Sequence, residues 1–178
     1  PHPPPPPANY TRVGSSAASD VYKRQLSDNA LLLVLESVEK PGNLGTILRT
    51  ADATGVDALI LNDPITDIFN PNVIRASAGV VFNVPTIIAS SEETQHYLGS
   101  KCIQSIATTP DTSTLYHEVA LNKPSAILMG SEKDGLSNFW LKEADIKTRL
   151  PMSGQADSLN VSVTTAIMLY EAIRQRTN

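Results

Sequence analysis

The sequence predicts an α/β domain, a mainly parallel sheet with helices on both faces. Short apolar runs such as Leu31–Glu36 and Ser125–Met129 alternate along the chain with stretches that suit helices. Continuous apolar runs of this length are typical of strands that are covered on both faces, and their alternation with helices is typical of a parallel sheet. With 178 residues, the chain is long enough for one such domain with a substantial core.

Composition excludes several other classes of protein. There is no run of about 18 apolar residues, so we expect no membrane span. The single cysteine, Cys102, excludes an internal disulfide and a metal site built from several cysteines. Its apolar surroundings predict a buried strand thiol rather than a reactive one, in a reducing, cytoplasmic compartment. The net charge of −4 argues against binding nucleic acid by bulk charge, so any RNA contact needs a local basic patch or a partner subunit.

Residues 1–25 differ from the rest of the chain. His2 stands within a proline run, and the segment has neither helical or strand periodicity nor enough apolar content to pack. We interpret it as a disordered tail, a linker or an artefact of the sequence, with a polyproline recognition segment as the minor alternative. The domain is therefore expected to occupy residues 26–178.

Turn and capping residues predict the first elements. After the strand Leu31–Glu36, a helix is expected from Leu44 to Thr54, with Asn43 as N-cap and Gly55 as C-cap. The next helix is expected to start at Asn70-Pro71 and to run to Ala78. The other predicted elements are strands over residues 58–61, 80–82, 84–89, 102–107, 125–129 and 147–150, and helices over residues 92–99 and 137–144.

The last predicted element is a long helix. Asp157 and Ser158 suit its N-cap, and Asn160 is a polar residue near its start that needs a polar partner. Spacings of three and four residues define the apolar stripe that we expect to be buried in the core, which consists of Val163, Ile167, Tyr170 and Ile173.

Three glycine-containing loops follow predicted strands, after Glu36, Met129 and Leu150. Because ligands bind beyond the carboxyl ends of strands in α/β sheets, we expect these loops to meet at one site. The sequence has no G-x-G-x-x-G fingerprint and no P-loop, which argues against an unrelated doubly wound nucleotide-binding enzyme. It has no G-x-S-x-G elbow, and its histidines lack metal-site spacing, so no metal is expected.

Polar residues in these segments suggest chemistry, although each has a simpler explanation. The planar guanidinium of Arg49 suits a phosphate, but a surface salt bridge would also explain it. Glu132 follows a strand and a glycine, and it could orient an arginine, accept a proton or simply be solvated. Capping alone could explain Asn43 and Ser158.

Three motifs, in this order, resemble those of the SpoU/TrmH-type RNA 2′-O-ribose methyltransferases of the SPOUT superfamily. They are Pro41-Gly-Asn-Leu-Gly-Thr-Ile-Leu-Arg-Thr-Ala with Glu36 before it, Ile127-Leu-Met-Gly-Ser-Glu followed by Gly-Leu-Ser, and Leu150-Pro-Met-Ser-Gly followed by Asp-Ser-Leu-Asn-Val-Ser-Val. The resemblance implies methyl transfer from S-adenosylmethionine to a ribose 2′-OH of RNA, with ribosomal RNA favoured over transfer RNA. The alternative is a non-catalytic RNA-binding or ribosome-associated module of the same fold.

The resemblance also implies a C-terminal trefoil knot, and a homodimer whose interface lies beside the site. The family's catalytic arginine matches Arg49, and its supporting polar residues match Asn43, Glu132, Ser158 and Asn160. Positions that bind the cofactor match Thr108, Gly130, Leu150, Met152 and Leu159.

The chain departs from the family pattern in two respects. Lys133 stands where many members have glycine, which leaves Glu132 in place. Many rRNA-modifying members also carry an N-terminal RNA-binding domain, whereas residues 1–25 do not resemble one. Together with the acidic net charge, this favours a fragment of a longer protein over a minimal enzyme.

Overall fold

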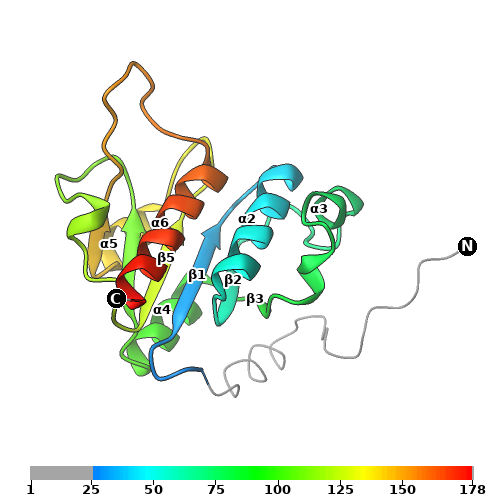
Figure 1. Ribbon diagram of the computed structural model, residues 1–178, viewed down its shortest axis with the longest axis horizontal. Coiled ribbons are helices and arrows are strands. Elements are labelled where there is room, and N and C mark those ends of the chain that lie inside the picture. The colour runs from blue at the N-terminus through cyan, green and yellow to red at the C-terminus, as the bar shows by residue number, and fades with distance from the viewer. Residues whose placement is uncertain (1–25, 178) are drawn as a thin grey trace, which may run out of the picture.

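A computed structural model describes residues 26–177 of the chain, so the interpretation of residues 1–25 lies outside the described residues. In this range the strands form one sheet of six parallel strands, in the order β3-β2-β1-β5-β4-β6 (Figure 1). The strands are β1 (Leu31–Glu36), β2 (Ala58–Asn62), β3 (Thr86–Ile88), β4 (Gln104–Thr108), β5 (Ser125–Met129) and β6 (Ile146–Thr148). The predicted α/β class with a parallel sheet is confirmed.

Helices cover both faces of the sheet. Leu33 and Leu35 of β1 belong to the core that packs under α2 and α6, whereas Leu32 and Val34 belong to the core under α4 and α5. The helices are α2 (Pro41–Thr54), α3 (Pro71–Ala76), α4 (Ser91–Ser100), α5 (Asn138–Glu143) and α6 (Val161–Arg176), with short 3₁₀ turns η1 (Val80–Phe82) and η2 (Tyr116–Glu118).

The strand order changes direction at β1. This strand pairs with β2 on one side and with β5 on the other, so consecutive parts of the chain are laid down on opposite sides of it. All strands are parallel, so the loops that leave β1, β5, β4 and β6 emerge at one edge. Such a switch point is the usual place for a ligand in an open α/β sheet.

The helix α2 begins at Pro41 and not at Leu44. Lys40 is its N-cap and makes no side-chain capping bond, because an ammonium group cannot accept a hydrogen bond. The fixed φ of Pro41 suits the first helical position. The prediction that Asn43 caps this helix is therefore wrong, and its side chain is available for other contacts. Gly55 ends the helix in the left-handed conformation (φ 65°), as predicted.

Two other expectations are also wrong. Residues 80–82 form the 3₁₀ turn η1 rather than a strand, because the N–H of Val80 bonds back to Ser77 after the left-handed turn at Gly79. Cys102 is exposed and has φ 53°, so its thiol is not buried in a strand. It occupies the turn that closes α4, where the N–H of Ile103 returns to the carbonyl of Leu98 (3.0 Å).

The helix α6 buries a different face from most of the stripe that we predicted, of which Ile173 does pack against the core. Val163 and Tyr170 are 46% and 56% exposed, whereas Thr165, Met168 and Leu169 are fully buried. The helix is apolar on more than one side, and its periodicity fits either stripe. Contact with α2 and the sheet selects the buried one.

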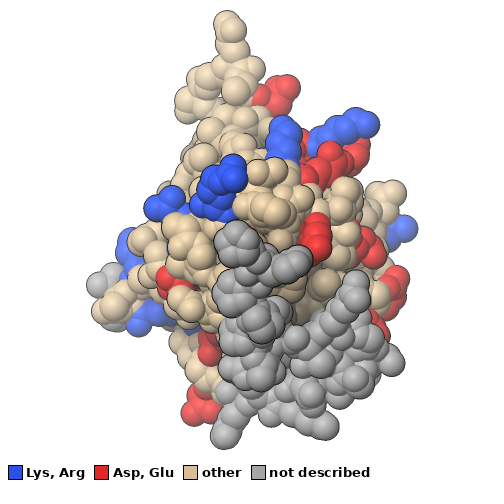
Figure 2. Space-filling view, turned by 90° about the vertical axis from the view of Figure 1, so that its right-hand side faces the viewer, with Lys and Arg blue, Asp and Glu red and all other residues tan. Residues whose placement is uncertain are grey.

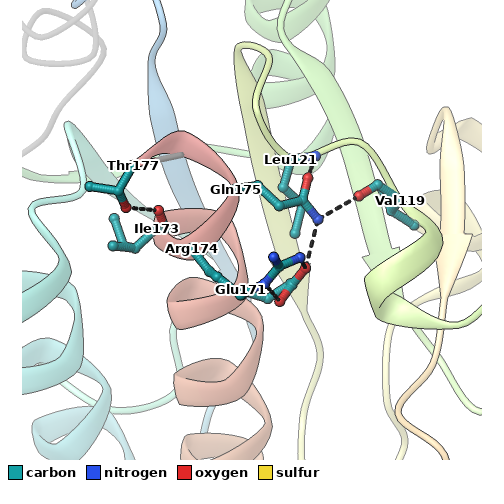
Figure 3. A network of polar contacts seen from close by, with 7 residues as sticks. All are labelled: Val119, Leu121, Glu171, Ile173, Arg174, Gln175 and Thr177. Atoms are coloured by element: carbon teal, nitrogen blue, oxygen red, sulfur yellow. Dashed lines mark hydrogen bonds and ion pairs between the residues drawn. The ribbon is translucent and has the colours of Figure 1, made fainter.

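The C-terminal end of α6 is fixed to the segment before β5 (Figure 3). Gln175 donates from Nε2 to the carbonyl of Val119 (3.0 Å) and accepts at Oε1 from the N–H of Leu121 (2.7 Å). Arg176 donates to the carbonyls of Leu121 (2.8 Å) and Lys123 (2.6 Å). The loop between β4 and β5 is thus held by the last helix of the chain.

Within residues 26–177, none of the helices has the length and apolar character that crossing a membrane requires.

Candidate functional site

A cavity of about 520 Å³ lies at the carboxyl edge of the sheet. Its walls come from residues at the ends of β4, β5 and β6 and from the segment that leads into α6. A cavity of this size suits a small-molecule ligand. All the positions that the resemblance assigns to the cofactor line it, namely Thr108, Gly130, Leu150, Met152 and Leu159.

The two ends of the loop after β5 pack closely against each other. Ser131 and Gly135 exchange two backbone hydrogen bonds, of 3.0 and 3.1 Å. A Cβ atom on Gly130 would lie 2.0 Å from the backbone carbon of Gly135, so only glycine fits there. Gly135 has φ 69°, in the left-handed region that favours glycine. This close packing restricts the position of Glu132, which lies between the two glycines in the sequence.

Side-chain hydrogen bonds link the three motif segments. Nδ2 of Asn43 in α2 donates to Oε1 of Glu132 in the loop after β5. Oδ1 of Asn43 accepts a hydrogen bond from Nδ2 of Asn160 (3.2 Å), at the start of α6. These contacts join residues that are 89 and 117 positions apart in the sequence. The fold therefore brings Asn43, Glu132 and Asn160 together, beside the cavity that the last two line.

Asn160 also caps α6. Its Oδ1 accepts from the backbone N–H of Ser162 (2.9 Å) and from the hydroxyl of the same residue (2.6 Å). The prediction that Asp157 or Ser158 is the cap is therefore wrong, because both precede the helix and are exposed. Ser158 nevertheless lines the cavity. The polar partner that Asn160 was expected to need is Asn43.

Arg49 is not brought to the cavity within one chain. It follows Asn43 by six residues on α2, which places the two side chains about 120° apart around the helix. Arg49 is exposed, and within residues 26–177 its guanidinium makes no hydrogen bond or ion pair. The sequence left open that Glu132 orients an arginine, whereas here its carboxylate accepts from Asn43.

The cavity walls have features that fit S-adenosylmethionine. Oγ1 of Thr108 is buried without a hydrogen-bond partner among the described residues, and it lies in the wall where a ligand could pair with it. The lining includes both cations and carboxylates, which suits a ligand that carries charges of both signs. Residues 26–177 contain no group of His, Cys, Asp or Glu side chains that could hold a metal ion.

Several charged residues of the lining had no role in the sequence-based prediction, and Arg149 and Asp111 are two of them. Arg149 directly follows β6, and Asp111 lies three residues beyond β4. Both lie just beyond a carboxyl strand end, which is where polar ligand-binding residues gather in parallel sheets. That placement is the signal that could have identified them.

The fold and the polar cluster define a class of protein, and comparison with known families identifies it. The SpoU rRNA Methylase family matches residues 30–170, so the chain belongs to this family. A 23S rRNA (guanosine(2553)-2′-O)-methyltransferase, RlmP of Bacillus subtilis, is 32% identical over 87% of this chain and 62% of its own length. An uncharacterised tRNA/rRNA methyltransferase of Synechocystis is 39% identical over 94% of this chain and 62% of its own length.

Solved structures agree with this assignment. An RNA 2′-O ribose methyltransferase superposes with a TM-score of 0.82 and 46% identity, over 88% of this chain and 60% of its own length. The AdoMet-bound rRNA methyltransferase of Sinorhizobium meliloti gives a TM-score of 0.82 and 37% identity, over 86% of this chain and 59% of its own length. The chain thus spans about three fifths of the length of these relatives.

Proposed function

We propose that the protein transfers a methyl group from S-adenosylmethionine to a ribose 2′-OH of RNA, with ribosomal RNA as the favoured substrate. The observation that carries this proposal is the hydrogen-bonded chain from Glu132 through Asn43 to Asn160, beside a cavity lined by the expected cofactor positions. The name of the Bacillus subtilis relative and the AdoMet-bound neighbour support the same reaction.

In this proposal the cofactor, when bound, supplies a methyl group activated by its sulfonium. Thr108, Gly130, Leu150, Met152 and Leu159 would hold it, largely through backbone groups of their loops. The protein's own contribution is mainly positioning.

The polar residues then position the RNA. Asn43 holds the carboxylate of Glu132, Asn160 holds Asn43, and Ser158 adds a hydroxyl to the cavity wall. Arg49 binds the phosphate next to the target ribose, because a planar guanidinium suits a phosphate. A guanidinium is very hard to deprotonate, so Arg49 acts as an orienting and charge-stabilising group rather than as a base.

We propose that RNA is recognised through such local contacts. The net charge is −4, and the face in Figure 2 carries acidic as well as basic side chains. Bulk electrostatic attraction to the phosphate backbone is therefore weak. This substrate also favours a cytoplasmic location.

We propose that two chains form a homodimer through the outer face of α6 and α2. Val163 and Tyr170 are large, apolar and exposed on α6, and the half-buried Ile167 lies between them in the sequence. This part of the predicted stripe is thus available to a second copy. Arg49, which does not reach the cavity of its own chain, would then serve the cavity of the partner.

Mixing two variants tests this arrangement. Arg49→Ala and Glu132→Ala are each expected to lose most of their activity when tested alone. A mixed dimer would contain one site with both residues intact, so mixing the two variants should restore part of the activity. A monomer in sedimentation, or no recovery after exchange of subunits, would contradict an Arg49 that acts across the interface.

We propose that the segment after β6 passes through the loop between β4 and β5 as a trefoil knot. The backbone of Arg149 bonds to Thr114 (3.0 Å) and Tyr116 (3.0 Å) of that loop. Further along the chain, Gln175 and Arg176 bond to residues 119–123 of the same loop. Contacts from both parts of the C-terminal segment support this threading.

The direct test of the reaction is methyl transfer from labelled S-adenosylmethionine to rRNA. We expect Arg49→Ala to lower kcat/KM by about a hundredfold, because it removes charge stabilisation and phosphate positioning together. Arg49→Lys keeps the charge without the planar guanidinium, so its kcat/KM should lie between those of wild type and Arg49→Ala. Activity of Arg49→Ala within about threefold of wild type would refute the assignment. No heat with millimolar S-adenosylmethionine in calorimetry would instead favour a non-catalytic module.

A further inference from the structure

Glu36 is a buried carboxylate to which the proposed mechanism gives no task. It is the last residue of β1 and is only 5% exposed. Its Oε2 accepts from the backbone N–H of Ser137 (2.7 Å), and its Oε1 accepts from the hydroxyl of Ser91 (3.3 Å). Carboxylates are seldom buried unless specific partners offset the cost of removing them from water. These bonds therefore indicate a specific role.

The bond to Ser137 falls at a particular point of the site. Ser137 is the N-cap residue of α5, where the loop that carries Glu132 ends. The start of this loop is fixed by the close packing of Gly130 on Gly135. Glu36 therefore holds the other end, and it does so through the backbone.

Two residues that flank the connection from β1 to α2 thus bind this loop. Glu36, at the end of β1, accepts from Ser137, and Asn43, in the first turn of α2, donates to Glu132. We propose that Glu36 is a positioning residue for the methyl-transfer site. It fixes the loop of residues 130–137 so that Gly130 lines the cavity and Glu132 meets Asn43. This inference rests on the proposed function only for its consequence, since the effect on the loop stands without it.

Asn62 offers a matched control. It ends β2, the neighbour of β1, and is fully buried. Its Nδ2 donates to the carbonyl of Ala89 (2.8 Å), the carbonyl of Ser90 (3.3 Å) and the hydroxyl of Thr94 (2.8 Å). Like Glu36, it ties a strand end to the start of α4, but it makes no hydrogen bond to residues 130–137 among the described contacts. Loss of Asn62 should therefore weaken the fold without loosening the loop selectively.

Two substitutions of Glu36 separate hydrogen bonding from simple filling of space. Glu36→Gln keeps an oxygen for the N–H of Ser137, and its amide can donate to the hydroxyl of Ser91, which can also accept. Glu36→Met has a similar length but no strong acceptor, so the part-buried hydrogen bond from the N–H of Ser137 is lost. Ser137→Pro removes the same N–H from the other side, and the φ of −62° at Ser137 suits proline.

The experiment measures hydrogen exchange of the cofactor-free chains by mass spectrometry and S-adenosylmethionine binding by calorimetry. We expect Glu36→Met and Ser137→Pro to speed exchange selectively in residues 130–137 and to weaken binding about tenfold. Glu36→Gln should stay within about twofold of wild type in both measurements. Asn62→Leu should lower the unfolding temperature but keep the affinity.

Several results would overturn the proposal. They are unchanged loop exchange in both Glu36→Met and Ser137→Pro, an equal loss of affinity in Asn62→Leu, and a Glu36→Gln variant as impaired as Glu36→Met. If Glu36→Met does not fold, Ser137→Pro decides the question, since it leaves the carboxylate in place. If wild type binds no S-adenosylmethionine, the proposed function fails, while the exchange data still decide whether Glu36 positions the loop.

Discussion

Asn160 has two tasks in the structure, and one substitution can separate them. Its Oδ1 caps α6 by accepting from the N–H of Ser162, and its Nδ2 donates to Asn43. Asn160→Asp keeps an oxygen for the cap but replaces the donor with a second acceptor, which then faces Oδ1 of Asn43. Asn160→Ala removes both contacts. We therefore expect Asn160→Asp to impair methyl transfer without destabilising the protein.

The sizes of the two effects follow from the contacts. Loss of an N-cap side chain costs about 1 kcal/mol of stability, and a carboxylate at a helix N-terminus adds about 0.3–1 kcal/mol. Asn160→Asp should thus be as stable as wild type or slightly more so. The bond to Asn43 is exposed and 3.2 Å long. Its loss, with two acceptors placed face to face, is worth about 1–2 kcal/mol, or roughly tenfold in kcat/KM.

Chemical denaturation and single-turnover methylation of rRNA measure the two properties independently. Asn160→Asp should keep the unfolding free energy and lose about tenfold in rate, whereas Asn160→Ala should lose both. The reasoning is refuted if Asn160→Asp methylates within about twofold of wild type, because the link to Asn43 would then have no part in the chemistry. It is also refuted if both variants are destabilised equally.

Two further predictions concern packing and pH. Gly130→Ala should lower the free energy of unfolding by at least about 2 kcal/mol and abolish cofactor binding, because its Cβ would overlap Gly135. Gly99→Ala, whose Cβ would have nothing within 4 Å, should instead stabilise α4 by up to about 1 kcal/mol. Equal melting temperatures for these two variants would contradict the packing argument. The hydrogen bond from Arg174 lowers the pKa of Glu171 in the folded protein. The resulting stability is present above the pKa of the unfolded chain and is lost as the pH falls through the folded pKa. The free energy of unfolding of wild type should therefore exceed that of Glu171→Gln by less than about 1 kcal/mol at neutral pH, since Arg174 is largely exposed. This difference should disappear in acid. A difference that is independent of pH would exclude the ion pair as its cause.

Local signals in the sequence were sufficient for most of the fold. The apolar runs at Leu31–Glu36 and Ser125–Met129 form strands that are buried along their whole length, as their continuous apolar composition predicted. Asn70 and Gly55 cap helices as predicted, since capping depends on a few neighbouring residues. The prediction of a strand at residues 80–82 was wrong because the β-branched composition of this segment does not show that the glycine before it is left-handed.

The candidate site was predictable in most of its members but not in its bonds. The position of three loops at the carboxyl ends of parallel strands was enough to expect that they meet. The pairing of Asn43 with Glu132 and with Asn160 was not predicted, because Asn43 was taken for a cap. The start of α2 at Pro41 changes that role, and nothing near Asn43 in the sequence reveals a partner 89 residues away.

The sequence by itself determined the class of fold, most of the strands and helices in their order, and the three segments that form the candidate site. These features depend on periodicity, turn residues and motifs, which act over short stretches of chain. Only the tertiary structure decided which face of α6 is buried, which residue of the loop that carries Glu132 is held by Glu36, and that Arg49 lies outside the cavity of its own chain. Each of these depends on contacts between segments far apart in the chain, and the free energy of such contacts is absent from any local pattern.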